Sequence, residues 1–196
     1  MRKFVLLFVL VCFSALSFGQ PASGKWNSAT ATYINAKYGV RWQLYEDGDW
    51  VERPILTNDA IFKMRDDNYH ILVKLIVETF EGPAEDVWAA VPMFQAKEYQ
   101  KKERANAKAQ GMELKSFTAA KTVVSGLHAT RTKSHMTKYY RQYKETIHAI
   151  DYTYYLSSGR TIYTVSITAL SLRDDELTVF DKLRDTLING FTLNNL

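Results

Sequence analysis

The sequence predicts an α+β fold in which an antiparallel sheet of about six to seven strands is flanked by helices, as an α/β/α sandwich. Two observations lead to this prediction. Most of the chain consists of apolar or alternating segments separated by turn residues, which is typical of antiparallel strands. Residues 84–111 and 174–188 instead have helical patterns. With 196 residues, of which 46% are hydrophobic, the chain can bury one core.

The first 19 residues are predicted to be a signal peptide rather than part of the fold. Arg2 and Lys3 precede an apolar run over residues 4–16, and the small residues Ser17 and Gly19 suit cleavage before Gln20. The apolar run is shorter than the ~20 residues that a membrane span needs. We therefore expect an exported protein, periplasmic or secreted, with an uncleaved N-terminal anchor as the alternative.

Cleavage would change the composition of the chain. It removes Cys12, which is the only cysteine, so the exported protein would contain neither a disulfide nor a thiol nucleophile. The 177 remaining residues carry a net charge of +2, compared with +4 for the full chain. Export also argues against a nucleic-acid partner.

The segments after the signal peptide are expected to form a flexible leader, residues 20–31, and a single α+β domain, residues 32–196. Residues 69–80 are apolar on both faces and are expected to lie centrally, covered on both sides. Pro92 is expected to split the first helical segment and to be followed by a longer, well-exposed helix. Residues 45–58 are expected to be irregular. The expected strands are 31–35, 40–44, 61–64, 69–80, 113–124, 127–137, 147–156, 161–170 and 191–193.

Three segments carry a resemblance to a known family. They are Tyr38-Gly39-Val40-Arg41-Trp42 followed by Trp50, then Asp59-Ala60-Ile61-Phe62, and last the helix 180–188 leading into Gly190-Phe191-Thr192-Leu193. Over residues 32–193 the order of elements resembles the PsbP/Mog1-like superfamily, which includes small bacterial envelope proteins of the DcrB type. The resemblance implies an antiparallel sheet flanked by helices. It also implies an accessory, adaptor or binding role without a shared catalytic site.

Catalytic and metal-binding motifs are absent from the sequence. It contains no GxSxG elbow, HExxH, P-loop or dinucleotide glycine pattern. The four histidines are not spaced as a metal pair, and His128 and His135 are expected on opposite faces of one strand. The acidic loop 46–49 lacks the ligand spacing of a calcium loop. No enzymatic activity, cofactor or metal is expected.

One carboxylate stands in an otherwise aromatic strand. Asp151 could be the acid of a tyrosine-lined cleft with His148 and Tyr152, or it could pair with Arg160 across the turn or with a tyrosine. The pairing is favoured. The cleft defines the alternative function, a small-ligand-binding protein or hydrolase.

Charge is distributed unevenly along the chain. Residues 46–86 carry a net charge of −7 and residues 97–144 a net charge of +9. Two interpretations remain open. The acidic hairpin could pack beside the basic helix and cancel its charge, or the basic half could attract an acidic partner.

The basic half interleaves cations with tyrosines. This combination suits a protein hot spot, phosphate headgroups or acidic glycans, although a tyrosine-rich hairpin tip could also pack on its own sheet. The expected function is that of an exported, non-enzymatic accessory or adaptor protein of the bacterial envelope. It would bind a protein partner or an anionic envelope component, peripheral membrane contact included; a purely structural oligomer is a third interpretation. The predicted partner-binding residues are Lys97, Lys101, Lys102, Arg104, Lys138, Tyr139, Tyr140, Arg141, Tyr143 and Lys144.

Overall fold

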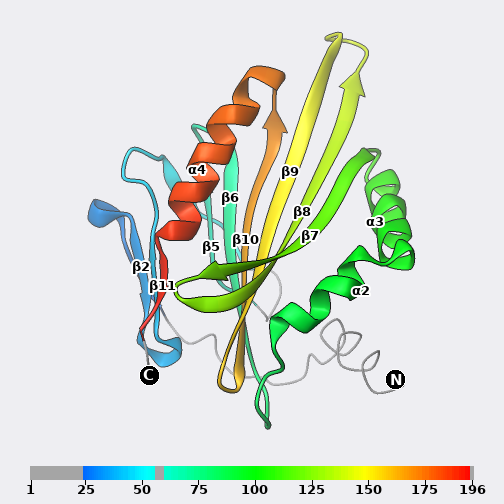
Figure 1. Ribbon diagram of the computed structural model, residues 1–196. Coiled ribbons are helices and arrows are strands. Elements are labelled where there is room, and N and C mark those ends of the chain that lie inside the picture. The colour runs from blue at the N-terminus through cyan, green and yellow to red at the C-terminus, as the bar shows by residue number, and fades with distance from the viewer. Residues whose placement is uncertain (1–23, 56–59, 195–196) are drawn as a thin grey trace.

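The computed structural model describes residues 24–55 and 60–194, and its centre is a seven-stranded antiparallel sheet (Figure 1). Neighbouring strands follow the order β4-β5-β6-β10-β9-β8-β7. These strands are β4 (Trp50–Glu52), β5 (Ala60–Asp66), β6 (Ile71–Thr79), β7 (Glu113–Val124), β8 (Leu127–Tyr140), β9 (Glu145–Ser158) and β10 (Thr161–Leu172).

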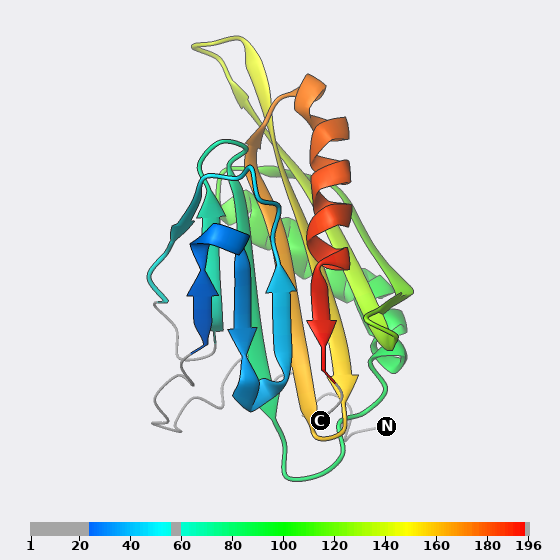
Figure 2. The same ribbon diagram turned by 90° about the vertical axis from the view of Figure 1, so that its left-hand side faces the viewer.

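A second, four-stranded sheet packs on one side of the main sheet (Figure 2). The sequence did not predict it as a separate sheet. Its strand order is β1-β2-β3-β11, and every neighbouring pair is antiparallel. The strands are β1 (Lys25–Asn27), β2 (Thr32–Asn35), β3 (Val40–Gln43) and β11 (Phe191–Leu193).

The helices lie on both sides of the main sheet. Helices α2 (Val91–Gln95) and α3 (Lys97–Ala109) pack against β7 on one side. Helix α4 (Leu177–Asn189) lies on the other side, next to the second sheet and continuous with β11 (Figures 1 and 2). The predicted α+β class and the antiparallel sheet flanked by helices are therefore confirmed.

The core lies between the two sheets and α4. Alternate residues of β6, among them Ile71, Val73 and Leu75, are fully buried and face this core, as the alternation of a strand requires. Trp42 of β3 is also fully buried, packs edge-on against Phe191, and donates an indole hydrogen bond of 2.8 Å to the carbonyl of Leu187 in α4. Strand β3, strand β11 and helix α4 therefore share one packing unit.

Three local predictions differ from the structure. The expected leader is ordered from residue 25, since β1 pairs with β2 and Trp26 packs against Phe62 at 5.9 Å. The expected irregular segment contains the short edge strand β4. A short 3-10 helix, η3 (Val87–Ala90), precedes Pro92 as expected, but Pro92 lies in the first turn of α2, where its missing N–H costs no hydrogen bond. The break before the longer helix α3 comes at Ala96, which is extended. The predicted signal peptide lies outside the described residues.

Strand β6 is interior, between β5 and β10, but it is not covered equally on its two faces. On the face turned away from the core, Leu72 and Ile76 are half-buried. Helices α2 and α3 pack over β7 rather than over this strand. The expected cover on both sides is thus only partial within the described part of the chain.

The strand order separates the two charged segments. The acidic residues 46–86 supply β4, β5 and β6 at one edge of the main sheet, and the basic residues 97–144 supply α3, β7 and β8 at the other. Strands β10 and β9 lie between them. The acidic hairpin therefore does not pack beside the basic helix, and the charge asymmetry of the sequence becomes a charge asymmetry of the molecule.

Candidate functional site

The β8–β9 hairpin projects beyond the rest of the main sheet (Figure 1). Near its tip the side chains of Tyr139, Tyr140 and Tyr143 are 58%, 40% and 66% exposed. The alternative interpretation, in which the tyrosines pack on their own sheet, is therefore wrong. The Lys138 amine lies 5.0 Å from the centre of the Tyr140 ring, a cation–π distance. Arg141 and Lys144 are exposed in the turn.

Helix α3 extends this basic surface. Only Ala107 is buried in the helix, so Lys97, Lys101, Lys102 and Arg104 are all exposed, as the sequence predicts. The Lys138 amine lies near Gly111, two residues after the end of the helix, since a Cβ at that glycine would be 3.9 Å from it. Lys97 begins the helix about 18 Å from its last residue, Ala109, at 1.5 Å per residue. The ten predicted residues thus form a band from the hairpin tip along α3 rather than a single cluster.

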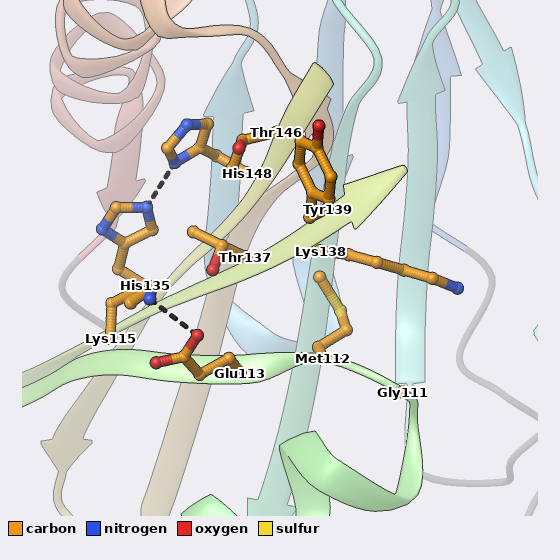
Figure 3. A pocket seen from close by; sticks show the side chains of 10 residues that line it. All are labelled: Gly111, Met112, Glu113, Lys115, His135, Thr137, Lys138, Tyr139, Thr146 and His148. Atoms are coloured by element: carbon orange, nitrogen blue, oxygen red, sulfur yellow. Dashed lines mark hydrogen bonds and ion pairs between the residues drawn. The ribbon is translucent and has the colours of Figure 1, made fainter. Parts of the chain in front are cut away.

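A cavity of about 650 Å³ lies at the base of the projecting hairpin (Figure 3). Its lining includes Lys115 and Glu113, which form an ion pair at 2.6 Å, and Tyr139 from β8. It also includes two histidines in direct contact, with His135 Nε2 at 2.7 Å from His148 Nδ1. The tautomers decide which ring donates and which accepts.

The histidine pair is held by a carboxylate at the start of the C-terminal helical segment. His148 Nε2 lies 2.6 Å from Asp174 Oδ1, in a contact that lacks the alignment of a hydrogen bond. Burial lowers the pKa of His135, and His148, Lys133 and Lys115 lower it further by repulsion. His135 is therefore neutral at neutral pH, which suits a hydrogen bond between the two rings.

Sequence reasoning did not find this pair. His135 faces Ile150 across the ladder, and His148 precedes Ile150 by two residues, so the two histidines are diagonal neighbours on one face. Only the strand register brings them together. Without the register, residues 13 apart in the sequence carry no signal of contact.

The alternative pocket around Asp151 is not assembled in the structure. Tyr152 faces α4, where its hydroxyl donates a 2.8 Å hydrogen bond to Asp181, and His148 contacts Asp174 just before that helix. Asp151 faces the opposite side of the sheet, as the period of two along a strand requires. It accepts hydrogen bonds from Thr153, at 2.8 Å, and from Thr168.

The favoured partner of Asp151 is also corrected. Arg160 donates its Nε hydrogen to the carbonyl of Phe80 instead, at 2.9 Å. Threonine hydroxyls from the same strand and from β10 satisfy Asp151, since they stand next to it on the same face of the sheet. Asp151, His148 and Tyr152 therefore share no cleft.

Two further properties bear on possible sites. Among residues 24–55 and 60–194, no three histidine, aspartate or glutamate side chains are gathered in a way that could hold a metal ion. Within the same ranges, no helix is long and apolar enough to cross a membrane.

Comparison with known proteins identifies the fold. No known protein family matches the sequence, and no curated protein does either. The structure is similar to cyanobacterial PsbP (CyanoP) from Synechocystis sp. PCC 6803, with a TM-score of 0.51 and 14% identity over 93% of this chain and 99% of that chain. The chain therefore has a PsbP-like fold, as the resemblance in the sequence implied.

Two other solved structures are similar at lower scores. One is a crystal structure from Bacteroides thetaiotaomicron VPI-5482, with a TM-score of 0.48 and 8% identity over 90% of this chain and 50% of that chain. The other is LpqN, a protein involved in cell envelope biogenesis of Mycobacterium tuberculosis, with a TM-score of 0.46 and 14% identity over 92% of this chain and 89% of that chain.

Proposed function

We propose that this protein is an exported, non-enzymatic accessory protein of the bacterial envelope that docks onto an acidic protein partner. The docking surface is the β8–β9 tip together with the exposed cations of α3. One observation carries the proposal: the tip holds three exposed tyrosines beside Lys138, Arg141 and Lys144, and it projects away from the core. The signal-like N-terminus supports export, and the PsbP-like fold is consistent with an accessory role.

The composition of the tip favours a protein partner. Tyrosine and arginine are enriched in binding hot spots, because each combines apolar area with hydrogen-bonding groups. The acidic segment at the opposite edge of the sheet gives the molecule two charged ends. Such a charge distribution orients an approaching acidic partner toward the basic edge.

Photo-crosslinking at the tip tests the proposal. The full chain is produced in bacteria with a photo-crosslinking amino acid at position 143, which the structure leaves exposed. We expect an adduct of one discrete mass in the envelope fraction, weakened by salt because exposed charges are screened beyond about 8 Å at physiological ionic strength. In the variant K138E/R141E/K144E the adduct is expected to disappear.

The control is K37E/R41E/K182E, which makes the same charge change at exposed positions away from the tip. This variant should crosslink as the unmodified chain does. An adduct that survives reversal of the tip charges, or no adduct at all, would contradict the proposal. Binding to vesicles containing phosphatidylglycerol without a protein adduct would instead assign the tip to the membrane surface.

A further inference from the structure

A polar cavity of about 260 Å³ lies where the β7–β8 turn meets the end of α4 and strand β11. The hydroxyl of Ser125, in the turn, accepts a 3.0 Å hydrogen bond from the N–H of Leu193 in β11. This contact joins the turn to β11 and bounds the cavity on one side. Binding sites for small molecules typically measure about 300–1,000 Å³, so a ligand held inside this cavity is a small one.

Two guanidinium groups meet at this cavity from different elements. Arg131 of β8 faces Tyr154 directly across the β8–β9 ladder, and Arg184 of α4 donates a hydrogen bond of 3.5 Å to the Tyr154 hydroxyl. All three residues line the cavity. Burial raises the pKa of Tyr154, while the hydrogen bond from Arg184 and the charges of both arginines act in the opposite direction. Both cations therefore lie close to the Tyr154 hydroxyl, which keeps its proton.

The fold neutralises one of these arginines and not the other. Arg184 pairs with Asp185 at 3.1 Å and, more distantly, with Asp181 at 3.9 Å. Arg131, by contrast, has no carboxylate partner within 4.0 Å in the part of the chain that the structure describes. The positive charge of Arg131 thus remains available to an anionic ligand.

The end of α4 also lies at the cavity, and the carbonyl groups of a helix end disfavour an anion. Here the fold engages two of them. The Leu187 carbonyl accepts a 2.8 Å hydrogen bond from the Trp42 indole. The carbonyl of Gly190, directly after the helix, accepts a 2.9 Å hydrogen bond from the N–H of Gln43. These donors offset part of the negative charge at the end of the helix.

The donors around the cavity suit a phosphate group better than a carboxylate. One guanidinium can bind both oxygens of a carboxylate, whereas a phosphate group has further oxygens for a second guanidinium and for a hydroxyl. Arg131, Tyr154 and Arg184 supply these donors from two strands and a helix. Asp185, which also lines the cavity, favours phosphate over sulfate. Orthophosphate retains a hydrogen at neutral pH that it can donate to a carboxylate, and sulfate does not.

We propose that this cavity binds a phosphate group, with Arg131 and Arg184 on the phosphate oxygens and the Tyr154 hydroxyl as a third donor. The ligand would be free orthophosphate or a phosphate monoester. The site lies at the end of β8 opposite to the docking tip and shares no residue with the docking surface. The inference therefore does not depend on the proposed function.

Isothermal titration calorimetry at neutral pH and constant ionic strength tests the proposal. The protein is titrated with inorganic phosphate, glycerol 3-phosphate, sulfate and acetate. We expect at least one of the two phosphates to bind about tenfold more tightly than sulfate or acetate, because these lack the proton or the additional oxygens that the site can use. Tighter binding of inorganic phosphate assigns the site to the free ion, and tighter binding of glycerol 3-phosphate assigns it to a monoester.

Variants locate the site. Arg131→Gln is expected to weaken phosphate binding about tenfold, the scale of one charge-assisted hydrogen bond. Tyr154→Phe keeps the ring, removes the third donor and should weaken binding about threefold. Arg104→Gln is the matched control, since this arginine is exposed on α3, and it should leave binding unchanged.

NMR of the unmodified protein replaces Arg131→Gln if that variant does not fold. The Nε–H signals of Arg131 and Arg184 should shift saturably with phosphate, and the signal of Arg104 should not. Three outcomes would overturn the proposal. They are no saturable binding of either phosphate up to about 10 mM, equal affinity for phosphate, sulfate and acetate, and equal affinity of Arg131→Gln and Arg104→Gln for phosphate. Tighter binding of acetate than of phosphate would assign the cavity to a carboxylate and would also overturn it.

Discussion

At the scale of single residues, the fold is stable because its buried polar groups have hydrogen-bond partners. Asp66, at the end of β5, is fully buried. Its carboxylate accepts hydrogen bonds from the Tyr45 hydroxyl and from the backbone N–H groups of Asp49, at 2.9 Å, and Asn68, at 3.0 Å. Burial raises the pKa of Tyr45, and its contact with Asp66 raises it further, so Tyr45 remains a donor. A buried carboxylate is tolerated here because three donors replace water.

Replacing Asp66 by alanine should destabilise the fold more than removing one of its donors. Asp66→Ala leaves the buried Tyr45 hydroxyl and two partly buried backbone N–H groups without this acceptor, and we expect a loss of about 3 kcal/mol in the free energy of unfolding. Tyr45→Phe removes one hydrogen bond and should cost about 1–2 kcal/mol. Urea unfolding of both variants measures the difference. Equal losses would show that the carboxylate network is not what stabilises this corner.

His135 should make stability depend on pH. Its pKa is lowered below 6.5 by burial first and then by His148, Lys133 and Lys115, so the unfolded chain binds the proton more readily than the folded one. The free energy of unfolding should therefore fall as the pH is lowered through 6.5.

Urea unfolding at about pH 7.5 and about pH 5.5 measures this contribution. His135→Gln should show a smaller loss of stability on acidification than the unmodified protein, because the group that titrates is gone. The same loss in both proteins would contradict an origin in His135.

At the scale of elements, the junction of α4, β11 and β3 shows how close packing constrains the sequence. Gly190 follows α4, and its carbonyl accepts a hydrogen bond of 2.9 Å from the N–H of Gln43. A Cβ at position 190 would lie 2.0 Å from the carbonyl oxygen of Gln43. The sequence predicts that the C-terminal helix ends at Gly190. Only the structure shows that the missing side chain of this glycine lets the backbone of β3, from the other end of the chain, pack directly against it.

Gly190→Ala should therefore separate β3 from α4. We expect a loss of about 2 kcal/mol or more in the free energy of unfolding, since a backbone atom rather than a flexible side chain must move. Gly82→Ala is the matched control, because a Cβ there meets nothing within 4 Å. Chemical denaturation of both variants distinguishes them. Equal stability of the two would contradict the close approach.

At the scale of the whole molecule, the two sheets share one core. Trp42 from the second sheet, Ile71 and Val165 from the main sheet, and Phe180 from α4 belong to the same buried cluster. Neither sheet can keep this core when the other is lost. Strand order then determines the distribution of surface charge, because it places the acidic strands at one edge of the main sheet and the basic strands at the other.

The shared core predicts one cooperative unfolding transition. Tryptophan fluorescence reports on Trp42 in the core, on Trp26 and Trp50 packed against it, and on Trp88 near α2. It should give the same midpoint as far-ultraviolet circular dichroism. Two separate midpoints would show that the second sheet unfolds independently. The chain would then contain two cooperative units.

The sequence by itself predicted the features that depend on neighbours along the chain. The interior position of β6, the helical pattern of α4 and the exposure of α3 can be read locally, because side-chain periods of 2 and 3.6 are local properties. The opposed charges of the two segments are likewise visible in the sequence. The same period of two also separates Asp151 from His148 and Tyr152. The strand period alone could therefore have excluded a cleft formed by these three residues.

Only the tertiary structure decided which distant residues meet. It divided the strands between two sheets, joined His135 to His148, and placed Lys133 of β8 and Arg184 of α4 on the ring of Tyr152. These contacts depend on strand register and on the packing of α4, and a shift of one residue in register would turn each side chain to the other face. Because register is fixed by the whole core rather than by any one segment, the sequence pattern could not specify these contacts.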